Sequence, residues 1–238
     1  MRKLIAAAAL IAVPLAAILG IVLWNGERWD IAAVIAAFLC CVPFFFSFER
    51  RAPMAREVVL VAVMTAFSVA GRFVFAAIPF FKPVTAIVVI TAMHFGPQAG
   101  FMTGAMSALI SNIYFGQGAW TPFQMFCWGM IGFIAGLLNK NRLLEKPVLL
   151  CVYGIFAGAM YSVIMDIWTV LSADNVLNFE RLFATFAASL PITAAYCVSN
   201  AVFLLVLRKP LGGKLRRLKT KFGVFCEDNS IELLSDSE

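Results

Sequence analysis

The segment 115–129 carries polar and aromatic side chains at the start of an otherwise apolar run. Amide, hydroxyl and indole groups at a boundary between membrane and water either bind a polar substrate or anchor a helix there. Positions 120 and 124 are one helical turn apart, so we expect their side chains to share a face. The residues of interest are Gln117, Trp120, Thr121, Gln124 and Trp128.

Further polar side chains lie at a similar predicted depth in other apolar runs. Burying such groups is costly unless each finds a partner, so a cluster at one depth indicates a solvated cavity that binds a substrate. Two simpler interpretations stay open: Arg72 and Asp166 form an ion pair, and Trp120 and Trp128 belong to an aromatic belt. The further candidate substrate-binding residues are Arg72, Lys82, Asn112, Tyr161 and Asp166.

The residue types exclude several kinds of chemistry. The chain has a single histidine, His94, and its six cysteines form no C-x-x-C pair, so neither a zinc site nor a disulfide framework is predicted. It also lacks a phosphate-binding G-x-x-x-x-G-K-[ST] loop and a G-x-S-x-G turn. We therefore predict no catalytic residue, no metal and no cofactor.

The composition indicates an all-α integral membrane protein. Of 238 residues, 62% are hydrophobic and only 13% are charged, whereas about a quarter are charged in a soluble domain. We interpret the first apolar run as a retained span rather than a cleaved signal. The predicted membrane spans are 4–24, 30–47, 57–78, 83–95, 98–114, 120–138, 147–171 and 182–207.

The basic residues predict the orientation of these eight spans. Clusters at 2–3, 50–56, 140–146 and 208–221 hold most of the lysines and arginines, and such clusters mark cytoplasmic segments. Four spans then separate the second cluster from the third. The prediction is a multi-pass protein of the cell membrane with both termini in the cytoplasm. The last cluster, which we call the basic segment, suits an anchor on anionic membrane lipid or a solvated linker. An acidic tail at 227–238 follows it.

Small residues recur at four-residue spacing, which permits close contact between helices. The pairs Gly100 and Gly104, Gly132 and Gly136, and Gly154 and Gly158 are most simply explained by packing inside the bundle. A triple of alanines, Ala62, Ala66 and Ala70, lies on one predicted helix face. In an alanine-rich chain this spacing alone is weak evidence for a function.

The block 56–209 resembles the substrate-binding S component of an energy-coupling factor (ECF) transporter. The similarity is carried by REVVLVAVMTAFSVAGR at 56–72, FKPVTAIVVI at 81–90 and HFGPQAGFMTGAMSALISNIYFGQGAWTPFQMFCWGMIGFIAGLL at 94–138. The implied organisation is an N-terminal pair of helices in 1–55, a six-helix S-component-like core in 56–209, and a basic then acidic tail in 210–238. The pair in 1–55 departs from the common six-helix pattern.

The resemblance implies a function as the substrate-capture subunit of an ECF-type ABC importer in a bacterial plasma membrane. Its partners would be a transmembrane coupling protein and two ATPase subunits, and its substrate a vitamin or related micronutrient. Within the family the similarity is to cobalamin-type members first and queuosine-precursor members next. The implied docking surface is the face of Ala62, Ala66 and Ala70, and the outer ends of the helices with the loop 79–82 would hold the substrate.

Two alternatives come from other classes, and no nucleic-acid partner is expected. A stand-alone secondary transporter usually shows inverted repeats, and no convincing repeat relates the two halves of this chain. An integral-membrane enzyme would have to use Asp166, His94 or Arg72, although His94 is predicted at the opposite side of the membrane from the other two. Three outcomes distinguish these classes. An S component should copurify with a coupling protein and ATPases, a secondary transporter should transport alone, and an enzyme should convert its ligand.

Overall fold

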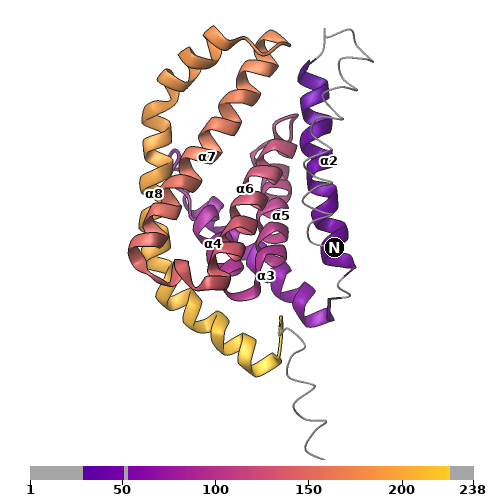
Figure 1. Cartoon of the computed structure of the whole chain (residues 1–238), viewed down its shortest axis with the longest axis vertical. Coiled ribbons are helices and arrows are strands. Elements are labelled where there is room, and N and C mark those ends of the chain that lie inside the picture. The colour runs from indigo at the N-terminus through magenta and orange to yellow at the C-terminus, as the bar shows by residue number, and fades with distance from the viewer. Residues whose placement is uncertain (1–28, 51–52, 226–238) are drawn as a thin grey trace, which may run out of the picture.

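The computed structural model describes residues 29–50 and 53–225. The predicted span 4–24 and the acidic tail lie outside these ranges. The described part consists of seven α-helices and two short 3-10 turns (Figure 1). In order they are α2 (Trp29–Glu49), α3 (Ala55–Val74), α4 (Val84–Phe95), α5 (Pro97–Phe115), α6 (Thr121–Leu138), η1 (Asn139–Asn141), η2 (Leu143–Glu145), α7 (Pro147–Asp174) and α8 (Phe179–Phe222).

Every apolar run predicted between residues 30 and 207 forms a helix. The predicted division between the two short runs is correct, since Gly96 has a φ of 90° and separates α4 from α5. The eighth span of the prediction, 4–24, lies outside the described residues. The largest difference concerns α8, which was expected at 182–207 and continues as helix through the basic segment to Phe222.

Not all of these helices have the length of a full crossing. Within the described residues, α3, α6 with its continuation to Asn141, α7 and α8 are long and apolar enough to span a membrane. The apolar part of α2 and the whole of α4 are shorter. With 12 residues, α4 is about 18 Å long, against roughly 30 Å of hydrocarbon.

The helices α3 to α8 alternate in direction and give the bundle two distinct ends. The Arg72 end is formed where α3 and α5 finish and where α4 and α6 begin. The His94 end is formed where α4 and α6 finish and where α5 and α7 begin. The long hairpin of α7 and α8 extends past the shorter helices at one end of the bundle (Figure 1).

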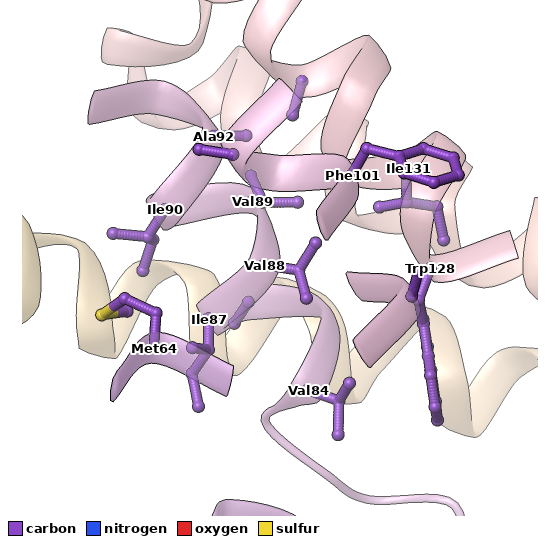
Figure 2. Close-up of a cluster of buried hydrophobic side chains, with 14 of the residues drawn as sticks. Met64, Val84, Ile87, Val88, Val89, Ile90, Ala92, Phe101, Trp128 and Ile131 are labelled. Carbon is purple, nitrogen blue, oxygen red and sulfur yellow. The ribbon is translucent and has the colours of Figure 1, made fainter. Parts of the chain in front are cut away.

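Helix α4 is the centre of the bundle because it is apolar on all its faces. Ten of its twelve residues are buried, and a helix that is hydrophobic all round is stable only when others surround it. Figure 2 shows its side chains Val88 and Val89 among those of Phe101 on α5 and Ile131 on α6. The chain therefore packs α3, α5, α6 and α8 around α4.

Glycines set the spacing between α5 and α6. A Cβ atom on Gly100 would lie 2.8 Å from the carbonyl oxygen of Gly132, and one on Gly104 would collide with the carbonyl group of Trp128. On α7, a Cβ atom on Gly158 would lie 2.8 Å from the backbone nitrogen of Cys197. The prediction that these glycines serve helix packing is confirmed.

The described helix of the N-terminal pair, α2, packs against the core. The ring of Phe44 stacks on Phe101 of α5, with centroids 4.0 Å apart, and meets Phe133 of α6 edge-on at 5.0 Å. The amide of Gln98 also donates a hydrogen bond of 3.2 Å to the hydroxyl of Ser47. These contacts attach α2 to the bundle as a further layer.

Helix α8 is far longer than a membrane crossing requires. Its 44 residues measure roughly 66 Å along the axis, and two internal prolines, Pro191 and Pro210, interrupt its hydrogen bonding. The final segment crosses beneath the bundle at the His94 end (Figure 1). Leu215, which is 2% exposed, holds this segment against the other helices.

The contact between α5 and α6 leads to a first prediction. Gly104→Ala places a methyl group where the Trp128 carbonyl lies, so the helices must separate, and we expect a destabilisation of about 1–3 kcal/mol. Thermal unfolding of the purified protein in detergent measures the effect. Gly213→Ala is the matched control, because nothing lies within 4 Å of a Cβ atom there. Equal melting temperatures for both variants would contradict the packing described here.

Candidate substrate-binding site

Arg72 places a buried positive charge at the end of α3. Its side chain is 9% exposed, and its guanidinium donates to the hydroxyl of Ser111 and, at 2.8 Å, to Oδ1 of Asn112 on α5. Among the described residues no carboxylate lies within 4 Å of it. Asp166 instead accepts a hydrogen bond of 2.6 Å from Ser189. The structure therefore does not form the alternative ion pair of Arg72 and Asp166.

Asn112 connects Arg72 to two further helices. Its amide nitrogen donates to Oε1 of Gln124 at 2.8 Å and to the hydroxyl of Thr121 at 3.0 Å, both on α6. The amide nitrogen of Gln124 in turn donates to the hydroxyl of Tyr161 on α7 at 3.1 Å. Arg72, Asn112, Gln124 and Tyr161 thus form one chain of hydrogen bonds across four helices, which we call the polar network.

Aromatic rings lie beside the polar network. The Arg72 guanidinium is 4.6 Å from the centroid of Phe115 and 5.3 Å from that of Trp128, distances typical of cation–π contacts. Trp128 stacks on Tyr161 with centroids 5.3 Å apart, and Tyr161 meets Tyr196 of α8 at 5.1 Å. The Arg72 guanidinium and the rings of Trp128, Tyr161 and Tyr196 therefore lie in one continuous series of contacts.

This surface borders a cavity of about 210 Å³ at the Arg72 end. Residues from α3, α4, α6, α7, α8 and the loop before α4 contribute to its wall. Of the described residues that line it, two are basic and none is acidic. The lining is formed by Arg72, Pro79, Phe80, Lys82, Val84, Thr85, Gln124, Trp128, Tyr161, Tyr196 and Asn200.

The loop between α3 and α4 closes one side of the cavity. The backbone N–H of Lys82 donates to the hydroxyl of Ser199 on α8 at 3.0 Å, and that hydroxyl lies 3.3 Å from the Lys82 carbonyl oxygen. Burial, followed by the nearby charge of Arg72, lowers the pKa of the Lys82 amine. A ligand group with negative charge density at this position would compensate both cations.

The structure brings together some of the predicted site residues and separates others. Arg72, Lys82, Gln124 and Tyr161 line the cavity, and Asn112 and Thr121 support them from behind through hydrogen bonds. The remaining three lie outside the lining. Gln117 is exposed and accepts a hydrogen bond from Thr121, Trp120 is 39% exposed and covers Gly118, and Asp166 pairs with Ser189.

Sequence reasoning missed part of the lining. Trp128 was open to interpretation as a belt residue, yet it is 7% exposed and faces Arg72. Tyr196 and Asn200 on α8 were not considered. Their spacing of four residues within an apolar run places two polar groups on one helix face, and this was an available signal.

The exposed face of α3 is the second feature of interest. This helix buries Met64, Thr65 and Ser68. Ala62, Ala66 and Ala70 are exposed on its other side. These three alanines therefore form an exposed face of α3, which we call the alanine face.

Comparison with known proteins agrees with this architecture. A family model described as ECF-type riboflavin transporter, S component, matches residues 53–216. A UPF0397 protein of Vibrio atlanticus (strain LGP32) is 26% identical over 164 residues, covering 65% of this chain and 90% of the relative. A UPF0397 protein of Aliivibrio salmonicida (strain LFI1238) is 29% identical over 161 residues, covering 62% and 85%. No solved structure matches.

The match confirms the resemblance to S components, which belong to transporters rather than to enzymes. Cobalamin specificity receives no support from the comparisons, since the family description names riboflavin. Together with the several apolar helices, the match identifies a membrane protein. Because the matched region covers well over half of the sequence, the chain belongs to the family of S components of ECF-type riboflavin transporters.

Proposed function

We propose that this protein is the substrate-capture subunit of an ECF-type importer and that it binds a small, planar heteroaromatic micronutrient in the cavity at the Arg72 end. The observation that carries this proposal is the cavity itself, where stacked aromatic rings meet the polar network. A transmembrane coupling protein with ATPases would supply the energy, since the sequence has no phosphate-binding loop of its own.

The size of the cavity favours a flavin-sized ring system over cobalamin. Ligand cavities commonly measure about 300–1,000 Å³, and this one, at about 210 Å³, lies below that range. A corrin macrocycle with its nucleotide arm has several times the volume of a tricyclic flavin ring. A queuosine precursor, also small and planar, remains the next candidate. The riboflavin named by the family description fits this chemical class.

The lining explains how such a ring system would be held. An electron-poor heterocycle stacks favourably on rings such as Trp128 and Tyr196. Its ring carbonyl groups would accept hydrogen bonds from Arg72 and Gln124, which are already oriented by the polar network. Because these donors are fixed before binding, little ordering entropy opposes the interaction.

The loop before α4 is suited to responding to the substrate. Phe80 lines the cavity with a φ of 59°, a left-handed conformation that is unfavourable for a side chain of this size. Its ring lies 5.6 Å from Tyr196. Strained backbone is common at ligand clamps, and here the loop 79–82 would close over a bound ring.

Two tryptophans and two glutamines form matched pairs, in which one member lines the cavity and the other does not. Trp128→Ala and Gln124→Ala should each weaken riboflavin binding by about 1–3 kcal/mol, roughly 5- to 150-fold, through lost stacking and an unpaired ligand group. Trp120→Ala and Gln117→Ala, which change residues outside the cavity lining, should bind nearly as the unaltered protein does. Quenching of flavin fluorescence measures the dissociation constants, and thermal unfolding checks the fold.

Cobalamin, titrated in parallel by calorimetry, is the competing probe. Binding of cobalamin but not riboflavin would reject the flavin-sized substrate. Riboflavin affinity that is unchanged in both Trp128→Ala and Gln124→Ala would reject the cavity as the site.

Orientation follows from the distribution of charge, and we propose that the His94 end faces the cytoplasm. The turns between α6 and α7 carry Lys140, Arg142 and Lys146, and the final segment of α8 is strongly basic. The Arg72 end and its cavity would then face outward, where a capture subunit meets its substrate.

Cysteine labelling of intact cells tests this orientation. Val176→Cys in the turn between α7 and α8 should react with an impermeant maleimide. Asn141→Cys in η1 should react only after the membrane is permeabilised. The protein without added cysteines supplies the background signal. Labelling of Asn141→Cys in intact cells would reverse the proposed orientation.

The alanine face of α3 is the proposed docking surface for the coupling protein. Small side chains let helix backbones approach closely, and Ala66 lies at the centre of the exposed face.

Ala66→Trp should reduce riboflavin uptake by cells at least tenfold, since a large side chain separates the two proteins. Riboflavin affinity of the purified subunit should stay within about twofold of the unaltered value, because Ala66 does not line the cavity. Ala187→Trp, at an exposed position on α8, is the control and should transport normally. Equal loss of binding and uptake in Ala66→Trp would assign this face to the subunit's own structure.

A further inference from the structure

The His94 end carries a second cavity that the proposed transport role does not use. It measures about 670 Å³ and lies between the turns η1 and η2 and the final segment of α8. We call it the basic cleft. Of the described residues that line it, one, Glu145, is acidic and six are basic: Lys140, Arg142, Arg208, Lys209, Arg216 and Lys219.

The positive charge of the basic cleft is poorly compensated inside the described structure. Glu145 lies 3.9 Å from Arg142, and both side chains are more than half exposed, so this ion pair is weak. Arg208 donates to the backbone carbonyl of Glu145 at 3.2 Å, and Lys219 donates to that of His94 at 3.1 Å. Carbonyl oxygens orient these side chains without neutralising them. Concentrated charge of one sign favours a polyanionic occupant.

The fold builds this cleft rather than leaving a random group of surface lysines. A Cβ atom on Gly212 would lie 3.1 Å from the imidazole of His94, so glycine allows α8 to approach α4 there. The backbone at Gly213 has open space beside it. Leu215 lies three residues after Gly212 on the same side of α8, and its burial fixes the rotation of this helix and thereby the direction of its basic side chains.

The described chain finishes beside the basic cleft. Gly223, with a φ of 57°, ends α8, and the following residues Val224 and Phe225 are buried. The backbone N–H of Phe225 donates to Oε1 of Glu57 at 2.6 Å, and its ring lies 5.2 Å from Phe95. Phe95 directly follows His94, a residue of the cleft wall.

The sequence that follows is complementary to the cleft in charge. Residues 226–238 read CEDNSIELLSDSE, with five carboxylate side chains and no lysine or arginine. A dozen residues reach up to roughly 40 Å when extended, which is ample for a cleft that begins next to the attachment point. Tethering also raises the effective concentration of the segment at the cleft to about the millimolar range.

We propose that the acidic segment 226–238 binds in the basic cleft of its own chain, with its carboxylates paired to the basic side chains there. The contact is intramolecular and independent of substrate. It neutralises the His94 end, and high ionic strength weakens it because the charges are partly exposed to solvent. An anionic lipid headgroup is the competing occupant.

A zero-length carbodiimide cross-linker tests the contact in the full chain, because it joins carboxylates only to amines that touch them. In nanodiscs of neutral phosphatidylcholine, the segment 226–238 should cross-link to the cleft lysines Lys140, Lys209 and Lys219, as read by peptide mass spectrometry. Lys214 and Lys221 lie on the same helix outside the cleft lining and serve as internal controls. Cleft cross-links should exceed control cross-links several-fold and fall in molar salt.

Two adjacent arginines provide matched variants. Arg216→Gln removes a cleft charge and should reduce the cleft cross-links several-fold, whereas Arg217→Gln, outside the cleft lining, should leave them unchanged. Cross-links spread evenly over cleft and control lysines, or insensitive to Arg216→Gln, would overturn the proposal. Absence of cleft cross-links in neutral discs would also overturn it. Phosphatidylglycerol retained by the unaltered protein, but not by Arg216→Gln, in native mass spectrometry would then identify a lipid site.

Discussion

The buried charge of Arg72 is the constraint on which the Arg72 end of this molecule depends. A guanidinium inside an apolar bundle is tolerable only when its donors are satisfied, and no described carboxylate is close enough to do this. Neutral partners take that place: Ser111 and Asn112 accept hydrogen bonds, and Phe115 and Trp128 present ring faces. The charge is thus solvated by the protein and stays available to a ligand. A carboxylate partner would have cancelled it.

Satisfying Arg72 requires four helices to meet at one depth, and the packing of the bundle makes this possible. The mostly apolar α4 occupies the centre, so the polar network is placed at its end. Glycines at positions 100, 104 and 132 bring α5 and α6 into backbone contact. That close contact places the amide nitrogen of Asn112 at 2.8 Å from Oε1 of Gln124, at the Arg72 end of the same helix pair. The glycine contacts between α5 and α6 therefore determine both the packing of the core and the geometry of the polar network.

The sequence was sufficient to predict the described helices, the approximate ends of all of them except α8, and the packing role of the glycines. The length of an apolar run and the spacing of glycines are local features of the sequence, and they do not depend on how the helices assemble. Arg72 and Gln124 were found for a similar reason, since a polar group in an apolar run is informative by itself. The direction in which a side chain points is a property of the assembled bundle. Trp120 and Trp128 look alike in sequence, yet only Trp128 reaches the cavity. Asp166 was grouped with Arg72 by depth, although the rotation of α7 and α8 gives it Ser189 as a partner.

The shortness of α4 has a consequence for the access of water to the cavity. Because other helices enclose α4, its twelve residues leave part of the membrane depth inside the bundle to the loop that carries Lys82 at the cavity edge. Non-helical backbone at membrane depth is tolerated where it is buried in protein or lines a water-filled cavity. Water would therefore reach the cavity below the ends of the longer helices, so that a polar nutrient need not cross hydrocarbon to enter.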